Sequence, residues 1–292
     1  MLSFGDRNPV TVALYYMTVV AVSMFTMDPV IHILTFAGGF IQFSMQKASN
    51  KGRTHLFFIV LGTILALIRP IFNHNGATVL FVMNDNPVTK EAFIYGINAA
   101  VMVVGVLYLF RIFSIIMTGD RLLYLFGRFS PKTALVMSMG LRYIPLLREK
   151  SRQIKAAQTA IGINKDDNAI DRIKAGMNVF SATVSWGLEN GIITADSMAA
   201  REYGKHRRTQ FSRFIFTKTD IGFVLLIIGL VLPSLLALSL GRYNTVFYPY
   251  FKMTEFTAFA IVGYTTFAIL MLMPVAVDIT ESFRWKYLVS RI

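Results

Sequence analysis

Apolar runs that are long enough to form membrane helices alternate with short polar loops along most of the 292-residue chain. An α-helix rises about 1.5 Å per residue, so about 20 apolar residues cross the roughly 30 Å hydrocarbon core of a bilayer. The pattern predicts an all-α integral membrane protein with about six transmembrane helices. The apolar runs cover residues 10–27, 30–45, 56–72, 91–117, 221–240 and 256–277.

A polar block separates the fourth apolar run from the fifth and divides the chain into three predicted domains. Residues 1–118 form four N-terminal spans, residues 119–218 form a cytosolic domain of long amphipathic helices, and residues 219–292 form two C-terminal spans. Within the block, apolar side chains recur at three- and four-residue spacing, which predicts two long helices joined by a polar loop.

Local signals predict where these two helices begin and end. The first starts near Lys132, contains Pro145, which we expect to kink it, and ends at Gly162. The second starts near Ala169 and continues up to Gly204, which is expected to stop it.

The remaining loops predict how the chain crosses the membrane. A short apolar run between turn-rich stretches, ATVLFVM at residues 77–83, predicts an interfacial or re-entrant hairpin instead of a span. With Arg7 assigned to the cytosol, Asp28, this hairpin and residues 241–254 fall on the outside. Every strongly cationic loop then lies inside, so both termini are predicted to be cytosolic.

Charge agrees with this topology and limits the partners. The net charge is +13, and residues 119–218 hold 17 Lys and Arg against 8 Asp and Glu, a net charge of +9. Cationic loops of membrane proteins prefer the cytosol, and the same surface is compatible with a protein partner. No nucleic-acid-binding module accompanies the charge, so nucleic acid is not an expected partner. With no cysteine and four histidines far apart in sequence, neither a metal site nor a cofactor is expected.

Two further groups of residues have more than one interpretation. Asp166, Asp167 and Asp171 resemble the aspartate-rich magnesium–diphosphate motif of membrane prenyltransferases. Such enzymes use two facing clusters and the chain has one, so an acidic cap of the following helix is the alternative. His32 and Arg69, near the ends of apolar runs, either line a path or lie at the membrane interface.

Several short motifs occur together in one order along the chain. They are NPV and DPV at the starts of the first two spans, NHNGATVLFVMNDNPVT, LRYIPLL at residues 141–147, and ADSMAAREYG at residues 195–204 followed by Arg207, Arg208 and Thr209. In combination they resemble the transmembrane T component of energy-coupling factor (ECF) transporters, the EcfT/CbiQ family. The resemblance covers essentially the whole chain.

This resemblance implies a non-catalytic scaffold that transmits ATP-driven motion from two cytosolic ABC ATPase subunits to a small membrane S component. The S component would bind a vitamin or metal ion for uptake across a prokaryotic cell membrane. The chain has no GxxxxGK-type nucleotide loop, in agreement with hydrolysis in partner subunits. The implied ATPase-docking residues are Ala199, Ala200, Arg201, Glu202, Gly204, Ala160, Ile161 and Gly162, and the implied helix-support residues are Arg142, Tyr143 and Pro145.

Two residues depart from the family pattern. Where the first motif commonly reads Ala-Gln-x-Ala-Arg-Gly, Ile161 occupies the arginine position, and Glu202 replaces the glycine after Arg201. We expect the first helix end to dock by apolar packing and the second through the guanidinium of Arg201, whose planar donors fit a carboxylate. This difference fits a pair of non-identical ATPases.

Two alternatives to this function follow from the same residues. A conventional ABC permease with its own substrate path is the nearer one, although the Glu-Ala-Ala type of cytosolic loop that such permeases carry is not found in the sequence. A membrane-embedded prenyltransferase-like enzyme is the more distant one.

Overall fold

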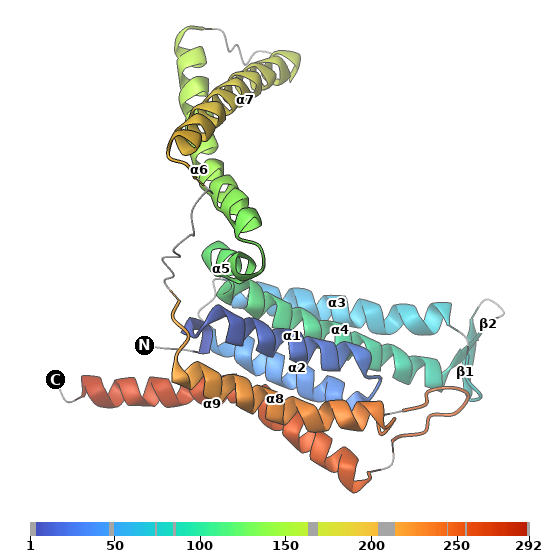
Figure 1. Cartoon of the computed structure of the whole chain (residues 1–292). Coiled ribbons are helices and arrows are strands. Elements are labelled where there is room, and N and C mark those ends of the chain that lie inside the picture. The colour runs from blue at the N-terminus through green and yellow to red at the C-terminus, as the bar shows by residue number, and fades with distance from the viewer. Residues whose placement is uncertain are drawn as a thin grey trace. The chain divides into compact units, whose positions relative to one another are not determined.

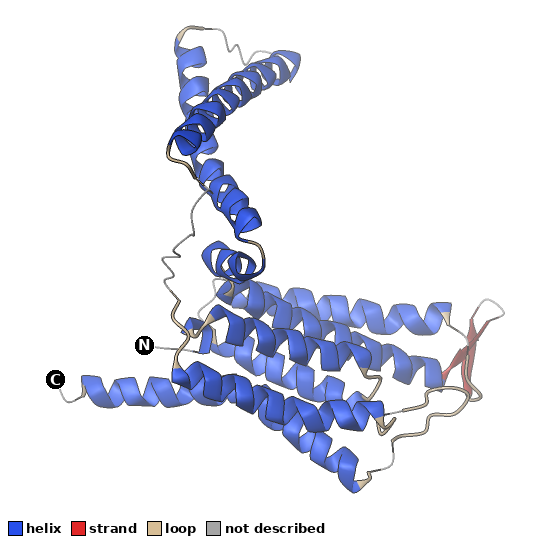
Figure 2. Cartoon of the chain, viewed as in Figure 1, coloured by secondary structure: helices blue, strands red, loops and turns tan. Residues whose placement is uncertain are grey.

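The computed structural model describes residues 4–290 except 47–49, 74, 84–85, 163–168, 204–213, 244 and 255. Helices dominate the fold, and two short strands form a hairpin, as Figure 2 shows. The chain divides into two compact units, with residues 1–118 and 214–292 in unit 1 and residues 119–213 in unit 2. The all-α fold predicted from the sequence is confirmed.

Unit 1 is a bundle of apolar helices (Figure 1). Asn8 and Asp28 each accept a hydrogen bond from the backbone N–H two residues ahead, and a proline occupies the first turn of the helix that follows. The NPV and DPV motifs therefore begin helices, as the sequence predicts. The helical elements are η1 (Phe4–Asp6), α1 (Pro9–Phe25), α2 (Pro29–Met45), α3 (Lys51–Phe72), α4 (Lys90–Ile116), α8 (Lys218–Ser239) and α9 (Ala258–Val289).

Length and composition identify which helices could cross a membrane. Within the described residues, α3, α4, α8 and α9 are long and apolar enough to do so. The apolar helices α1 and α2 have 17 residues each, which corresponds to about 25 Å and is slightly short of the hydrocarbon core. The chain is therefore a multi-pass membrane protein with four full-length candidate spans and two shorter apolar helices.

Glycines allow the central helices of unit 1 to approach closely. The helix α4 packs against α1, α2 and α3, and α2 also packs against α9. A Cβ atom added to Gly105 of α4 would lie 3.0 Å from the backbone nitrogen of Phe36 in α2. One added to Gly39 of α2 would lie 3.1 Å from Cβ of Tyr108. Small residues at such contacts allow helix backbones to pack closely in membranes.

Two buried polar side chains of α2 bond to neighbouring helices. The amide nitrogen of Gln42 donates to the hydroxyl of Tyr15, at 3.1 Å, and to the carbonyl of Met271, at 3.0 Å. The Nδ1 atom of His32 lies 2.9 Å from Oδ1 of Asn98. Because an unsatisfied polar group in an apolar interior costs several kcal/mol, these bonds fix how α1, α2, α4 and α9 sit against one another.

His32 and Arg69, the two residues that could have lined a substrate path, differ in burial. His32 is only 1% exposed, so its side chain is enclosed by the bundle. Its Nε2 atom lies 2.9 Å from the carbonyl of Thr26, and its ring is held entirely within the bundle. Arg69 is exposed, and its guanidinium lies 5.0 Å from the centroid of the Tyr95 ring.

A β-hairpin and a long loop meet at one end of unit 1. The strands β1 (Val79–Met83) and β2 (Asn86–Thr89) pair antiparallel, which confirms the hairpin predicted from the sequence. The backbone nitrogen of Ala77 donates to the carbonyl of Pro249, at 3.1 Å, so the hairpin region and the α8–α9 loop lie at the same end.

Asp28 binds this loop from the start of α2. Its Oδ2 atom accepts hydrogen bonds from the hydroxyls of Thr254, at 2.9 Å, and Tyr264, at 2.7 Å, and a longer one from Thr245, at 3.4 Å. Burial raises the pKa of the neighbouring Tyr243 phenol to about 12. Asp28, the hairpin and the α8–α9 loop therefore share one end of the bundle, as the predicted topology requires.

The opposite end of unit 1 holds the N-terminal residues. The backbone nitrogen of Phe4 donates to Oδ1 of Asp278 in α9, at 2.8 Å. The guanidinium of Arg7 lies 4.0 Å from the ring centroid of Phe223 in α8. The start of α1, the start of α8 and the second half of α9 are thus held together at this end.

Candidate functional site

Unit 2 covers residues 119–213 of the polar block and contains the two long helices predicted from the sequence. It contains α5 (Gly119–Phe129), α6 (Pro131–Ala160) and α7 (Ala169–Ala200). The helix α6 packs against both α5 and α7. In Figure 1, α6 and α7 cross, and their C-terminal ends lie apart. These two ends carry the residues to which the sequence assigns docking.

The crossing of α6 and α7 is built from three positions on one face of α6. The hydroxyl of Tyr143 lies 3.4 Å from Oγ1 of Thr194 in α7. One turn further along, Leu147 packs against Gly187, where an added Cβ atom would lie 3.1 Å from Cδ2 of the leucine. Residues four apart on a helix share a face, so Tyr143 and Leu147 both contact α7 from the same face of α6.

A cation–π contact completes the crossing. The Nζ atom of Lys150 lies 5.3 Å from the centroid of the Trp186 ring. Of the predicted support residues, only Tyr143 takes part in the contacts described for the crossing. Arg142 and Pro145 are exposed on α6, with Pro145 inside the helix.

The end of α7 has the hydrogen bonds of a Schellman motif. The backbone nitrogen of Glu202 donates to the carbonyl of Ala199 and that of Tyr203 donates to the carbonyl of Met198, both at 3.0 Å. Glu202 has a φ angle of 52°, in the left-handed region that this motif requires after the last helical residues. Arg201 is therefore the capping residue itself, directly beyond the helix.

The structure shortens the predicted second helix by three residues. The sequence extended this helix to Tyr203, with Gly204 as the stop. The helix ends at Ala200, because the left-handed conformation of Glu202 turns the backbone away before Gly204 is reached. Gly204 lies outside the described residues, and so do Arg207, Arg208 and Thr209 of the same motif.

The end of α6 has the same form with different residues. Ile161 is the capping residue, and Gly162 follows it with a φ angle of 78°. The backbone nitrogen of Gly162 donates to the carbonyl of Thr159, at 3.0 Å. Gly162 is confirmed as the glycine that terminates this helix, as the sequence predicts. Ile161 and Arg201 thus occupy the same capping position on two different helices.

The described docking residues are exposed at both helix ends. Ile161 is 74% exposed, and Arg201 is also exposed. The other exposed members are Ala160, Gly162, Ala199, Ala200 and Glu202. The small alanines next to each capping residue leave both sides of the tip accessible.

An apolar stripe, which the sequence also predicts, remains exposed along α7. Val179 and Thr183 are buried within unit 2, whereas the stripe is open. The exposed apolar residues are Ile170, Ile173, Met177, Phe180, Val184, Leu188, Ile192 and Ile193. The last two extend the stripe beyond the residues that periodicity singled out.

Only Asp171 of the aspartate cluster lies within the described residues. Asp166 and Asp167 lie outside the described residues, and Asp171 lies in the first turn of α7, where the helix dipole favours an acid. No group of three His, Cys, Asp or Glu that could hold a metal ion is found among the described residues.

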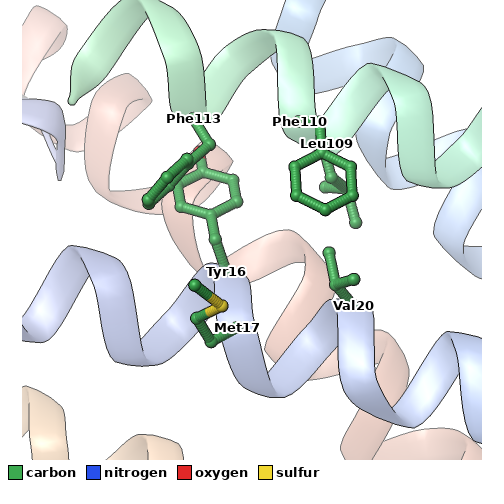
Figure 3. A pocket seen from close by; sticks show the side chains of 6 residues that line it. All are labelled: Tyr16, Met17, Val20, Leu109, Phe110 and Phe113. Carbon is green, nitrogen blue, oxygen red and sulfur yellow. The ribbon is translucent and has the colours of Figure 1, made fainter.

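A shallow groove between α1 and α4 is shown in Figure 3. Its lining side chains are apolar or aromatic, and the one hydroxyl among them, that of Tyr16, donates to Gln42 instead. Nothing in this lining would recognise a polar solute. The lining residues are Tyr16, Met17, Val20, Leu109, Phe110 and Phe113.

A bundle of apolar helices together with crossing amphipathic helices defines a multi-pass all-α membrane protein. The family model of CbiQ, described as cobalt transport protein, matches residues 7–212. The chain belongs to this family and is a membrane component of a transporter. The family resemblance read from the motifs is confirmed. The match covers α1 to α7 and ends before α8. A comparison with curated proteins found no match.

Proposed function

We propose that the chain is the coupling subunit of an ECF-type importer. In this role it carries motion from two cytosolic ABC ATPase subunits to a separate membrane S component that binds the substrate. The family description names cobalt transport, so a metal ion or another micronutrient such as a vitamin is the proposed cargo. Hydrolysis of ATP is assigned to the partner subunits, and the chain itself is proposed to be non-catalytic.

The observation that carries this proposal is the matched form of the two helix ends. Both long helices of unit 2 end in an exposed cap in which one side chain, Ile161 or Arg201, projects from the capping position. Alanines beside each cap leave room for a groove to close around it. The repetition supports two docking sites, one for each ATPase, with apolar contact at α6 and a guanidinium at α7.

Rigidity of the crossing supports a mechanical role. The contacts of Tyr143 with Thr194 and of Lys150 with Trp186 join α6 to α7 at two places along their length. A force applied at either tip would therefore move both helices together. A flexible loop could not transmit such a displacement.

The exposed stripe on α7 supports contact with a membrane component. Large apolar side chains such as Phe180 and Leu188 are 69% and 66% exposed, which is unusual for a helix that faces water on that side. Met177 adds a flexible side chain that can repack against partners of different shape. We assign this stripe to the S component.

The interior of unit 1 favours this function over a permease with its own path. The buried polar side chains Gln42, His32 and Asp28 each bond to other parts of the same bundle. A translocation path would need polar groups that face a solute or water instead.

Replacement of Arg201 by alanine tests the proposal. A carboxylate left without its partner in a closed groove costs roughly 3–5 kcal/mol, which corresponds to about a hundred-fold to several-thousand-fold weaker binding. We expect Arg201→Ala to reach the membrane normally but to lose copurifying ATPase and transport. Arg172→Ala removes an exposed arginine from the first turn of the same helix and should change neither. Unchanged copurification in the Arg201 variant would refute docking at this tip.

A further inference from the structure

The helix α9 is much longer than a bilayer requires. Its 32 residues correspond to about 48 Å, against a hydrocarbon core of roughly 30 Å. The hydrogen bond from the backbone of Phe4 reaches this helix at Asp278. Beyond it, residues 282–290 are all exposed. Figure 1 shows this end of α9 extending past the other helices of unit 1.

The exposed end of α9, residues 283–289, is apolar on opposite sides. Successive residues of a helix are rotated by about 100°, so Phe283 and Trp285 point to nearly opposite sides. Tyr287 lies one turn beyond Phe283, and Val289 lies one turn beyond Trp285. Phe283, Trp285 and Tyr287 are 68%, 51% and 59% exposed. A groove on a protein would cover one side of such a helix, whereas a layer of lipid headgroups surrounds it.

The charges of this segment identify the kind of layer. Arg284 and Lys286 stand between the aromatic residues, and the one acid nearby, Glu281, lies 4.0 Å from Arg284. Trp and Tyr concentrate at membrane–water interfaces, and cations close to a bilayer are attracted to anionic headgroups. The segment also continues a helix whose preceding apolar part is a candidate span.

We propose that residues 283–289 of α9 lie in the headgroup layer of the membrane and bind anionic phospholipid there. The aromatic rings set the depth of the helix end, and Arg284 and Lys286 select anionic lipid over zwitterionic lipid. This contact holds the end of α9 at the same bundle end as the N-terminal residues. The proposal is independent of ATPase docking, because it concerns residues of unit 1 only.

The two tryptophans of the chain make the segment directly observable. Trp186→Phe leaves Trp285 as the only indole in the full-length protein. This variant is reconstituted in vesicles of phosphatidylcholine, with and without phosphatidylglycerol. Quenching is measured with a nitroxide-labelled lipid and with aqueous iodide. We expect strong quenching by the lipid label, weak quenching by iodide, and a further shift toward the lipid label when phosphatidylglycerol is present.

Charge removal tests the selection of anionic lipid. In the Trp186→Phe background, the double substitution Arg284→Gln and Lys286→Gln is introduced. It should reduce the additional lipid-label quenching caused by phosphatidylglycerol roughly tenfold, since each cation near the surface contributes severalfold to binding. Arg242→Gln with Lys252→Gln removes the same two residue types from the α8–α9 loop and should leave the effect intact.

Two results would overturn the proposal. Efficient quenching of Trp285 by iodide but not by the lipid label would place the segment in water or on a protein. Equal quenching in both vesicle types, unchanged by removal of Arg284 and Lys286, would eliminate recognition of anionic lipid.

Discussion

At the scale of single residues, the two helix ends of unit 2 show what a side chain in the left-handed region costs. Gly162 adopts its φ of 78° without steric penalty, whereas Glu202 holds a φ of 52° with a Cβ atom in place. The sequence identified both positions from the family pattern. It could not show that Glu202 stands where the backbone turns, because the motif suggested Gly204 as the stop.

Replacement of Glu202 by glycine should therefore stabilise the end of α7. Relief of the left-handed conformation is expected to raise the free energy of unfolding by about 1 kcal/mol. Urea unfolding of the purified chain in detergent, followed by circular dichroism, measures the change. Glu189→Gly is the matched control, since this exposed glutamate lies inside the same helix, where glycine should cost about 1 kcal/mol. Destabilisation by both substitutions would contradict the assigned role of Glu202.

At the scale of elements, periodicity predicted which helices exist but placed some ends poorly. The sixth apolar run stops at Val277 because charged residues follow, yet α9 continues to Val289. Hydropathy measures preference for lipid, and residues 278–289 contain no glycine or proline that would end the helix in a polar environment. Similarly, α3 begins at Lys51, five residues before its apolar run, although cations in a first turn oppose the helix dipole.

The contact between α2 and α4 gives the prediction that belongs to this scale. Gly105→Ala would bring a methyl group to 3.0 Å from the backbone nitrogen of Phe36, and a backbone atom cannot move aside as a side chain can. We expect a loss of about 1–3 kcal/mol in unfolding free energy. Gly229→Ala in α8 meets no atom within 4 Å and should be neutral or slightly stabilising. Unfolding of both variants in detergent micelles, measured side by side, distinguishes them; equal behaviour would refute close packing at Gly105.

At the scale of the whole molecule, hydrogen bonds between residues far apart in sequence stabilise the helix bundle. Asp28 was predicted as a helix-starting residue on the outside, and its bonds to Thr254 and Tyr264 had no local signal. The same holds for His32, whose partner Asn98 lies 66 residues away. Sequence patterns report what a residue prefers locally, whereas such partners are chosen by the fold.

Asp28→Asn tests whether these long-range hydrogen bonds stabilise the α8–α9 loop. The substitution keeps one oxygen, so the hydroxyls of Thr245, Thr254 and Tyr264 lose their shared acceptor or the start of α2 loses its cap. A buried donor without a partner costs about 1–3 kcal/mol. Amide hydrogen exchange across residues 245–254 should accelerate in this variant. Asp196→Asn, an exposed aspartate of α7, is the control and should leave exchange in this loop unchanged.

The shared capping position of Ile161 and Arg201 has an electrostatic consequence for any partner. The C-terminal end of a helix carries roughly half a negative elementary charge on its free carbonyls. At α7 the guanidinium of Arg201 offsets this partial charge, and the exposed carboxylate of Glu202 stands next to it, so the tip carries charges of both signs. At α6 an isoleucine leaves it uncompensated in the last turn, so the tip is weakly negative. The surface that receives α6 should therefore offer N–H groups beside an apolar pocket, while the surface that receives α7 should offer a carboxylate for Arg201 and a separate donor for Glu202, so the two surfaces are not interchangeable.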